Sequence, residues 1–181
     1  MPLQGDVRPF AVTNTEVFVW FRKRKPSPAE MARELRERAL TAPPAEIGID
    51  PARALDNVWV VLMETGYPEA VASLVCFADG ATSLYFSNGG GMIGAGEHDT
   101  VRKAAVRFLA MANQNAAHLT AVKDHPLPAV GFVRFYARTA EGLRSADAAQ
   151  QILGAGGHPL SRLFAAGHAV ITAIRETGVG Q

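Results

Sequence analysis

The chain has 181 residues, of which 48% are hydrophobic and 19% charged, and 18 basic against 17 acidic residues leave a formal net charge of +1. This length and composition predict one compact domain and exclude disorder of its main body, while the near-zero charge excludes a broad field for nucleic acid or anionic lipid. A single cysteine, Cys76, excludes an intramolecular disulfide, and no apolar stretch reaches the roughly 18 residues of a membrane span, so we expect a cytoplasmic protein without membrane contact.

The N-terminal part of the chain predicts little regular structure. Residues 1–15 contain two prolines and a glycine without a hydrophobic period, so we expect an irregular arm in front of a single domain spanning residues 16–181. Residues 17–21 (VFVWF) are β-branched and aromatic, and predict a short buried strand. The basic residues 22–25 (RKRK) then end it, and they are too few, in a nearly neutral chain, to indicate a nucleic-acid partner.

A helix and three strands are expected next. The sequence Ser-Pro-Ala-Glu at residues 27–30 matches a capping box and predicts a peripheral helix over residues 28–40 with a narrow apolar side. After a proline-rich loop, residues 57–64 and 70–77 are apolar on both alternating faces, and residues 82–87 alternate. Short turns join these three runs, so they predict an antiparallel meander at the centre of the sheet.

The second half of the chain predicts a helix, a hairpin and a final helix. Residues 99–115 have apolar side chains at helical spacing, and residues 131–138 with 143–145 predict the hairpin. The last helix is expected over residues 159–175, where Gly167 predicts a close approach to another backbone. The expected fold class is α+β, with a mainly antiparallel sheet of about five strands and helices packed on its faces.

This succession of elements resembles the roadblock/longin-like branch of the profilin-like folds. The resemblance covers about residues 28–176 and rests on the order of the elements. It implies a five-stranded antiparallel sheet with helices on its faces, and a non-catalytic role in dimerisation or docking.

The glycine-rich stretch between the third strand and the second helix is the first candidate ligand site. Gly89, Gly91 and Gly94 satisfy G-x-G-x-x-G in front of a helix, a context in which backbone N–H groups can approach a phosphate. Positive charge in the first turns of that helix is favourable only beside an anion or a carboxylate. The candidate ligand-binding residues are Gly89, Gly90, Gly91, Gly94, Gly96, His98, Arg102 and Lys103.

The same stretch also fits a close-packed structural turn, which is the interpretation we favour. The dinucleotide fingerprint belongs to a parallel unit, whereas the strands before this loop predict an antiparallel meander. No acidic residue follows at the end of a second strand, and Asp99 is better explained as a helix N-cap. We therefore expect at least one of these glycines to have a positive φ, and a nucleotide- or phosphate-binding protein, with or without enzymatic activity, is the alternative.

Two alternating strands predict a second candidate surface. Tyr85 points away from the apolar side of its strand, and Arg134, Tyr136 and Arg138 do the same on the strand of the predicted hairpin. If both strands share one sheet, these four residues line one aromatic and basic face. Such a face suits a ligand or an acidic partner, and it equally suits a covering helix packed on arginine stems.

No residue pattern indicates catalysis or a metal. None of the five histidines has the H-x-x-x-H spacing of a zinc site, and Cys76 lacks a neighbouring base, so we expect no cofactor and no metal. We predict a non-catalytic module that acts by dimerisation and by binding a protein or a small ligand. A homodimer is expected because the narrow helix at residues 28–40 leaves apolar surface uncovered, and the interface should involve the third strand or the helix from Asp99.

Overall fold

A seven-stranded antiparallel sheet with helices on both faces forms the structure, a computed structural model that describes residues 25–50 and 58–178. The helices are α1 (Pro28–Thr41), α2 (Asp99–Gln114), α3 (Gln150–Gly154) and α4 (Ser161–Glu176), with short 3-10 turns η1 (Pro44–Ile47), η4 (Ala95–Glu97) and η5 (Ala116–His118). The strands are β1 (Val60–Gly66), β2 (Val71–Phe77), β3 (Thr82–Phe86), β4 (Gly91–Met92), β5 (Thr120–Ala121), β6 (Phe132–Thr139) and β7 (Gly142–Ala149).

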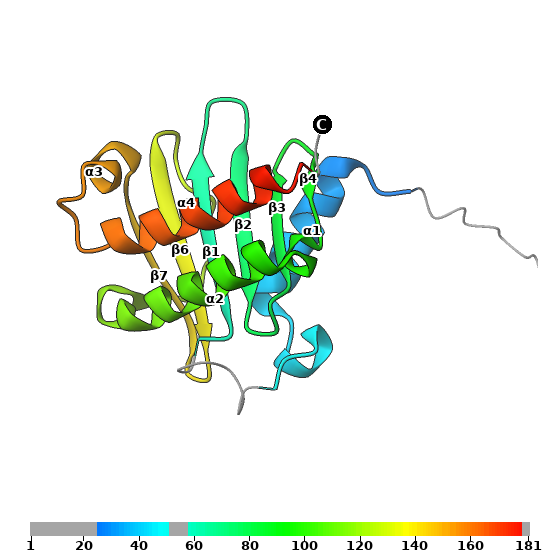
Figure 1. Cartoon of the computed structure of the whole chain (residues 1–181), viewed down its shortest axis with the longest axis horizontal. Helices are drawn as coiled ribbons and strands as arrows, with labels where there is room; N and C mark the ends of the chain where they lie inside the picture. The colour runs from blue at the N-terminus through cyan, green and yellow to red at the C-terminus, as the bar shows by residue number, and fades with distance from the viewer. Residues whose placement is uncertain (1–24, 51–57, 179–181) are drawn as a thin grey trace, which may run out of the picture.

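The order of strands across the sheet is β4-β3-β2-β1-β6-β7-β5 (Figure 1). The expected α+β class with an antiparallel sheet is confirmed, but the expected number of about five strands is wrong. The two additional strands, β4 and β5, are two-residue ribbons at the opposite edges of the sheet. Two residues are too few to show a hydrophobic alternation, which is why the sequence predicted loops there.

The expected meander and hairpin are both present, and they meet at β1. Strand β1 pairs antiparallel with β2, which pairs antiparallel with β3. On its other edge β1 pairs with β6, and its seven residues are all buried. The hairpin of β6 and β7 is longer than residues 143–145 predicted, because β7 stays paired as far as Phe132 opposite Ala149.

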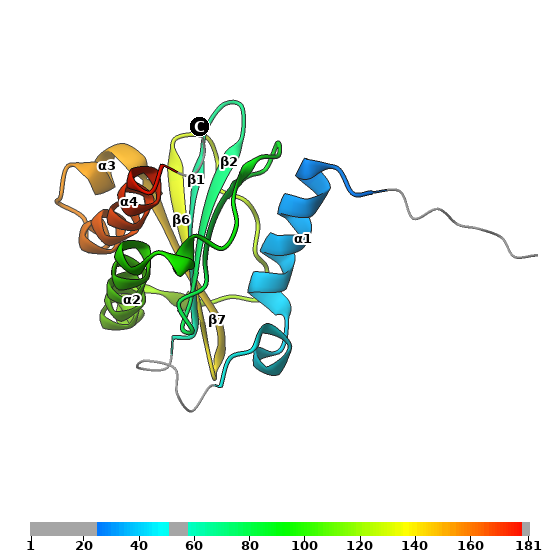
Figure 2. The ribbon, with the colours of Figure 1, turned by 45° about the vertical axis from the view of Figure 1, so that its right-hand side comes forward.

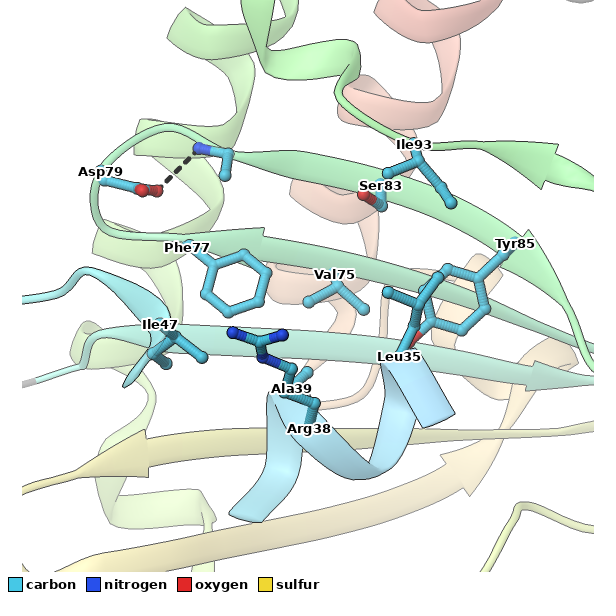
Figure 3. Close-up of a pocket in the computed structure, with 11 residues that line it drawn as sticks. Leu35, Arg38, Ala39, Ile47, Val75, Phe77, Asp79, Ser83, Tyr85 and Ile93 are labelled. Atoms are coloured by element: carbon cyan, nitrogen blue, oxygen red, sulfur yellow. Dashed lines mark hydrogen bonds between the residues drawn. The ribbon is translucent and has the colours of Figure 1, made fainter. Parts of the chain in front are cut away.

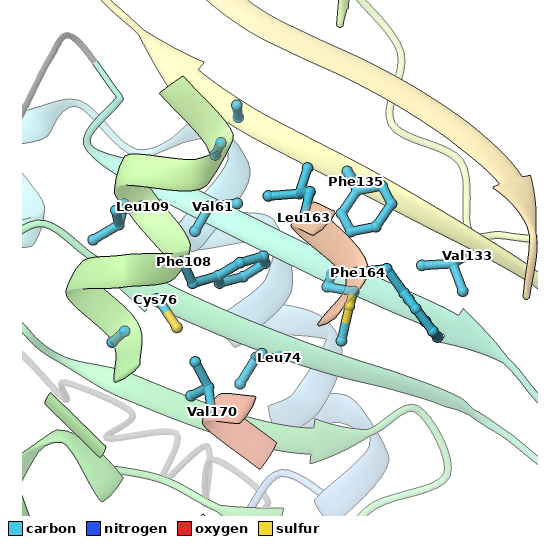
Figure 4. Close-up of a cluster of buried hydrophobic side chains, with 14 of the residues drawn as sticks. Val61, Leu74, Cys76, Phe108, Leu109, Val133, Phe135, Leu163, Phe164 and Val170 are labelled. Carbon is cyan, nitrogen blue, oxygen red and sulfur yellow. The ribbon is translucent and has the colours of Figure 1, made fainter. Parts of the chain in front are cut away.

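The alternating side chains of the strands build two separate cores. Helices α2 and α4 lie side by side on one face of the sheet, and α1 lies on the other (Figure 2). On the first face, Leu74 and Phe135 of the sheet pack with Phe108 of α2 and Leu163 of α4 (Figure 4). On the second face, Val60, Leu62 and Val75 pack with Ala32, Ala39 and Leu40 of α1.

The capping box at the start of α1 is confirmed. The Ser27 hydroxyl accepts a hydrogen bond from the Glu30 N–H at 3.2 Å, and the Glu30 carboxylate accepts one from the Ser27 N–H at 2.7 Å. Two N–H groups that a helix start leaves without a partner inside the helix are therefore satisfied. This bond pair defines where α1 begins and how the preceding chain enters it.

Two local expectations are wrong. The N-cap of α2 is His98 rather than Asp99, which is already the first helical residue. Gly167 of α4 approaches side chains rather than another backbone, since a Cβ there would lie 2.6 Å from the Met63 Sδ and 3.3 Å from a ring carbon of Phe108. The missing side chain makes room for these two large residues of the first core.

The predicted arm at residues 1–15 and the predicted strand at residues 17–21 lie outside the described residues. Within the described part of the chain, no helix is long and apolar enough to cross a membrane.

Candidate functional site

The aromatic and basic residues expected on one sheet face do share it, beneath α1. Tyr85 and Tyr136 are buried in the core between the sheet and α1. Arg138 donates a hydrogen bond to the Ala39 carbonyl of α1 at 3.1 Å, and its guanidinium lies 5.9 Å from the centre of the Trp59 ring. Most of this face is therefore covered by a helix, the second of the two interpretations that the sequence allowed. The polar groups of the face help to hold α1 in place.

The loop between β5 and β6 covers the rest of this face. Tyr136 donates a hydrogen bond from its hydroxyl to the Pro126 carbonyl at 2.6 Å, and Arg134 donates to the same oxygen at 3.1 Å. Arg134 also lies 3.4 Å from the Asp147 carboxylate on the neighbouring strand β7. Both candidate residues are thus engaged within the protein.

A buried ion pair that the sequence analysis missed anchors α1 to the centre of the sheet. The Arg36 guanidinium donates two hydrogen bonds to the Glu64 carboxylate, Nε to Oε1 at 2.7 Å and Nη2 to Oε2 at 2.8 Å. Glu64 is fully buried in β1, and the Ser73 hydroxyl of β2 donates a further hydrogen bond to its Oε1 at 2.9 Å. The available signal was an acidic residue inside an otherwise apolar strand, which requires a cationic partner when buried.

Arg36 extends this ion pair to the loop before β6. Its Nη2 also donates to the His125 carbonyl at 2.8 Å, and its guanidinium lies 5.8 Å from the centre of the Tyr136 ring. Burial by itself lowers the pKa of Arg36, but the hydrogen bonds and the charge of Glu64 outweigh this effect and raise the pKa. Arg36 therefore stays charged and holds helix, strand and loop in one arrangement.

Beside this anchor, α1 and strands β2 and β3 enclose a groove on the same face. The groove consists of two hollows with volumes of about 260 and 450 Å³, and we call it the α1 groove. Leu35, Tyr85 and Ile93 line both hollows, which are therefore neighbours, and Figure 3 shows these three residues in the first hollow. The first hollow reaches down to Ile47 and Phe77, and the second reaches up to Lys25, Pro26, Pro28 and Met31.

The Tyr85 hydroxyl is the unusual feature of the α1 groove. The Tyr85 side chain is only 4% exposed, and its hydroxyl has no hydrogen-bond partner among residues 25–50 and 58–178. Burial raises the pKa of Tyr85, and the charge of Glu64 adds to the increase, so the hydroxyl keeps its proton at any physiological pH. A buried hydroxyl without a partner costs free energy, about 1–3 kcal/mol, so a rearrangement that brought an acceptor oxygen to it would be favourable.

Two other polar groups of the α1 groove have partners within the protein. Arg38 donates from Nη2 to the Glu46 carbonyl of η1 at 2.9 Å, and the Asp79 carboxylate accepts from the Ala81 N–H at 2.8 Å (Figure 3). The remaining lining is dominated by apolar side chains. The groove thus combines a mainly apolar lining with a few polar side chains, among them the hydroxyls of Ser83 and Tyr85, the composition of a binding site.

The glycine-rich loop forms one wall of the α1 groove and packs closely elsewhere. The expected positive φ is confirmed at Gly89, Gly90, Gly91 and Gly94, with values of 103°, 89°, 124° and 79°. A Cβ on Gly89 would lie 2.6 Å from the Pro28 Cβ, and one on Gly91 would overlap the Leu84 carbonyl oxygen. A Cβ on Gly96 would overlap the Gly80 carbonyl oxygen.

Three backbone N–H groups of this loop have partners in nearby backbone. The Gly89 N–H donates to the Phe86 carbonyl at the end of β3 at 2.9 Å, and the N–H groups of Glu97 and His98 donate to the carbonyls of Gly94 and Ala95 at 3.2 Å. The Arg102 stem lies beside Gly80, in the turn between β2 and β3, while Lys103 is exposed. These contacts suit a structural turn, and the phosphate-binding alternative gains no support from them.

No group of three or more metal-ligating side chains occurs within the described ranges 25–50 and 58–178. A comparison of the chain with models of protein families, with curated proteins and with solved structures finds no match.

Proposed function

We propose that this protein is a non-catalytic binding module whose α1 groove holds an extended apolar segment of a partner protein. The observation that carries the proposal is Tyr85, which lines both hollows of the groove and whose buried hydroxyl has no partner among the described residues. Buried polar groups in native proteins almost always have a partner, so a hydroxyl in this position favours a bound acceptor.

The form of the α1 groove favours a peptide segment. The groove follows one side of α1 through Met31, Leu35 and Arg38, a stretch that rises about 10 Å along the helix. An extended segment of three or four residues covers such a length, places alternate side chains into the two hollows and offers backbone carbonyls to a donor. Tyr85 would donate to one of these carbonyls.

The ionisable groups support binding rather than chemistry. Burial raises the pKa of the Cys76 thiol to about 12 and also raises the pKa of Tyr85, so both remain protonated and are poor nucleophiles and bases. Arg36 and Glu64 neutralise each other beneath the helix. These groups stabilise the site, and the neutral donors that line the groove are the hydroxyls of Ser83 and Tyr85.

Selection of peptides from a phage-displayed library of random segments of about 12 residues, on the immobilised full chain, tests the proposal. We expect enriched peptides with aromatic and β-branched side chains, and calorimetry of a synthetic peptide against protein variants locates the site. Ile93→Asp should weaken binding about tenfold or more, and Tyr85→Phe about fivefold, the value of one hydrogen bond.

Ile152→Asp is the matched control for Ile93→Asp. Ile93 is 59% exposed in the groove wall and Ile152 is 54% exposed on α3, so neither substitution disturbs a core. Binding that survives Ile93→Asp, or that both variants weaken equally, would contradict the proposed site. The absence of any enriched peptide would contradict the proposed function.

Self-association, a cytoplasmic location and the roadblock/longin-like architecture accompany this proposal as predictions from the sequence. The same groove also accommodates a small apolar ligand, which would appear in the calorimetric experiment as a competitor of the selected peptide.

A further inference from the structure

We infer that residues 17–21 of this chain occupy the α1 groove in cis when no partner is bound. The inference rests on the proposed function, because it names the segment that competes with a partner for the same site. Residues 17–21 lie outside the described part of the chain, and three features of the described part carry the argument.

The first feature is chemical complementarity. Residues 17–21 read VFVWF, and β-branched and aromatic residues favour an extended backbone and an apolar environment. The α1 groove offers mainly apolar walls, and Tyr85, whose buried hydroxyl has no partner among the described residues, lines both of its hollows.

The second feature is where the described chain starts. Lys25 and Pro26 line the upper hollow of the groove, and α1 begins directly after them at Pro28. Six residues, 22–27, separate the VFVWF segment from α1, and connections of this length commonly join neighbouring antiparallel elements. A connection of this length would allow the segment to reach the groove.

The third feature is length. Five extended residues cover about 16 Å, and α1 rises about 15 Å from Pro28 to Arg38, the part that borders the groove. Running antiparallel to α1, the segment would cover Met31 and Ile93, two of the exposed apolar side chains of the described surface.

Trp20 provides a direct probe, because the chain contains only two tryptophans and the other, Trp59, is buried. In the full-length Trp59→Phe variant we measure the emission maximum of Trp20 and its quenching by acrylamide, with a synthetic peptide of residues 14–25 as the exposed reference. Fluorine NMR of the unsubstituted chain labelled with 5-fluorotryptophan gives the same information should Trp59→Phe not fold.

We expect Trp20 to be protected in the otherwise unsubstituted chain. Ile93→Asp should raise its quenching to the value of the free peptide, and the control Ile152→Asp should leave it unchanged. In the full chain carrying Phe18→Ser and Trp20→Ser, the phage-selected peptide should bind about tenfold more tightly if the segment occupies the groove about nine-tenths of the time.

The outcomes separate this inference from the proposed function. Trp20 exposed in the unsubstituted chain, together with peptide binding that depends on Ile93, overturns the inference and leaves the proposed function standing. Trp20 protected through Ile93, with no peptide bound even by the Phe18→Ser, Trp20→Ser chain, overturns the proposed function instead. Protection that disappears on dilution overturns cis occupancy and indicates that the segment enters the groove of a second copy.

Discussion

Arg36 of α1 and Glu64 of β1 form a two-pronged ion pair, with N–O distances of 2.7 and 2.8 Å, between the helix and the most central part of the sheet. The carboxylate is fully buried, and a third hydrogen bond from Ser73 completes its surroundings. This pair fixes α1 to the sheet at one point. Beside that point the space between α1 and the sheet is only partly filled, and this space is the α1 groove. Removal of the pair should therefore affect both stability and the groove.

Glu64→Leu should lower the free energy of unfolding by about 3 kcal/mol or more, because it leaves the Arg36 guanidinium buried without its counter-charge. The double variant Arg36→Leu, Glu64→Leu should lose clearly less, since both desolvation costs disappear together. Urea unfolding of Arg36→Leu, of Glu64→Leu and of the double variant measures the coupling. Additive losses would contradict a direct interaction between the two side chains.

Gly91→Ala should lower the free energy of unfolding by more than Gly90→Ala. Both glycines have a positive φ, which costs an alanine about 1 kcal/mol, but only at Gly91 would the new Cβ overlap the backbone of Leu84. At Gly90 the space is open. Thermal unfolding of both variants checks the order, and equal melting temperatures would contradict a close-packed role for Gly91.

Stability should fall as the pH rises above about 9, partly because of Cys76. Burial raises the pKa of its thiol from the ordinary 9.0 to about 12 in the folded chain. Between these values the unfolded chain releases the thiol proton and the folded chain keeps it, so the free energy of unfolding decreases by up to about 1.4 kcal/mol per pH unit. Below pH 9 this contribution is constant.

Cys76→Ala removes this contribution and serves as its test. Between pH 8 and 10.5 the variant should lose about 2 kcal/mol less than the unsubstituted chain, while the other groups act equally in both proteins. Urea unfolding at the two pH values measures the difference. Parallel losses in both proteins would contradict a buried thiol with a raised pKa.

The chain should form a homodimer through the surface of α2, as the excess of apolar faces predicts. Between α2 and α4 the outer surface has a furrow of about 340 Å³ lined mainly by alanines and Met111. Pairing of this patch with the same patch of a second copy, around a two-fold axis, would bury it. Light scattering coupled to size exclusion should give twice 19.3 kDa.

Ala110→Glu in this furrow should convert the dimer to a monomer, whereas Ile152→Glu on α3 should leave the dimer intact. The introduced charge would have to be desolvated in the interface, which costs more than the contact contributes. A mass near 19.3 kDa for the unsubstituted chain at micromolar concentration would contradict the prediction.

The sequence by itself determined the elements whose signals are local. Alternating side chains in residues 82–87 and 131–138 predicted β3 and β6, and the capping box predicted the start of α1. The narrow apolar side of α1 also explains the α1 groove, because Met31 and Leu35 are too few to fill the space above β2 and β3. Hydrophobic periodicity, helix capping and turn formation each depend on residues that are close together in the chain. These signals can therefore be read from the sequence without knowledge of the fold.

Only the tertiary structure decided which distant residues meet. Arg36 and Glu64 are 28 positions apart, and β1 pairs with β6 across an intervening stretch of some sixty residues that includes α2. The two-residue strands β4 and β5 exist because neighbouring strands present free backbone groups to them, with no pattern of their own. Such pairings are chosen by burial and hydrogen bonding summed over the whole sheet, a quantity that no local segment of the sequence contains.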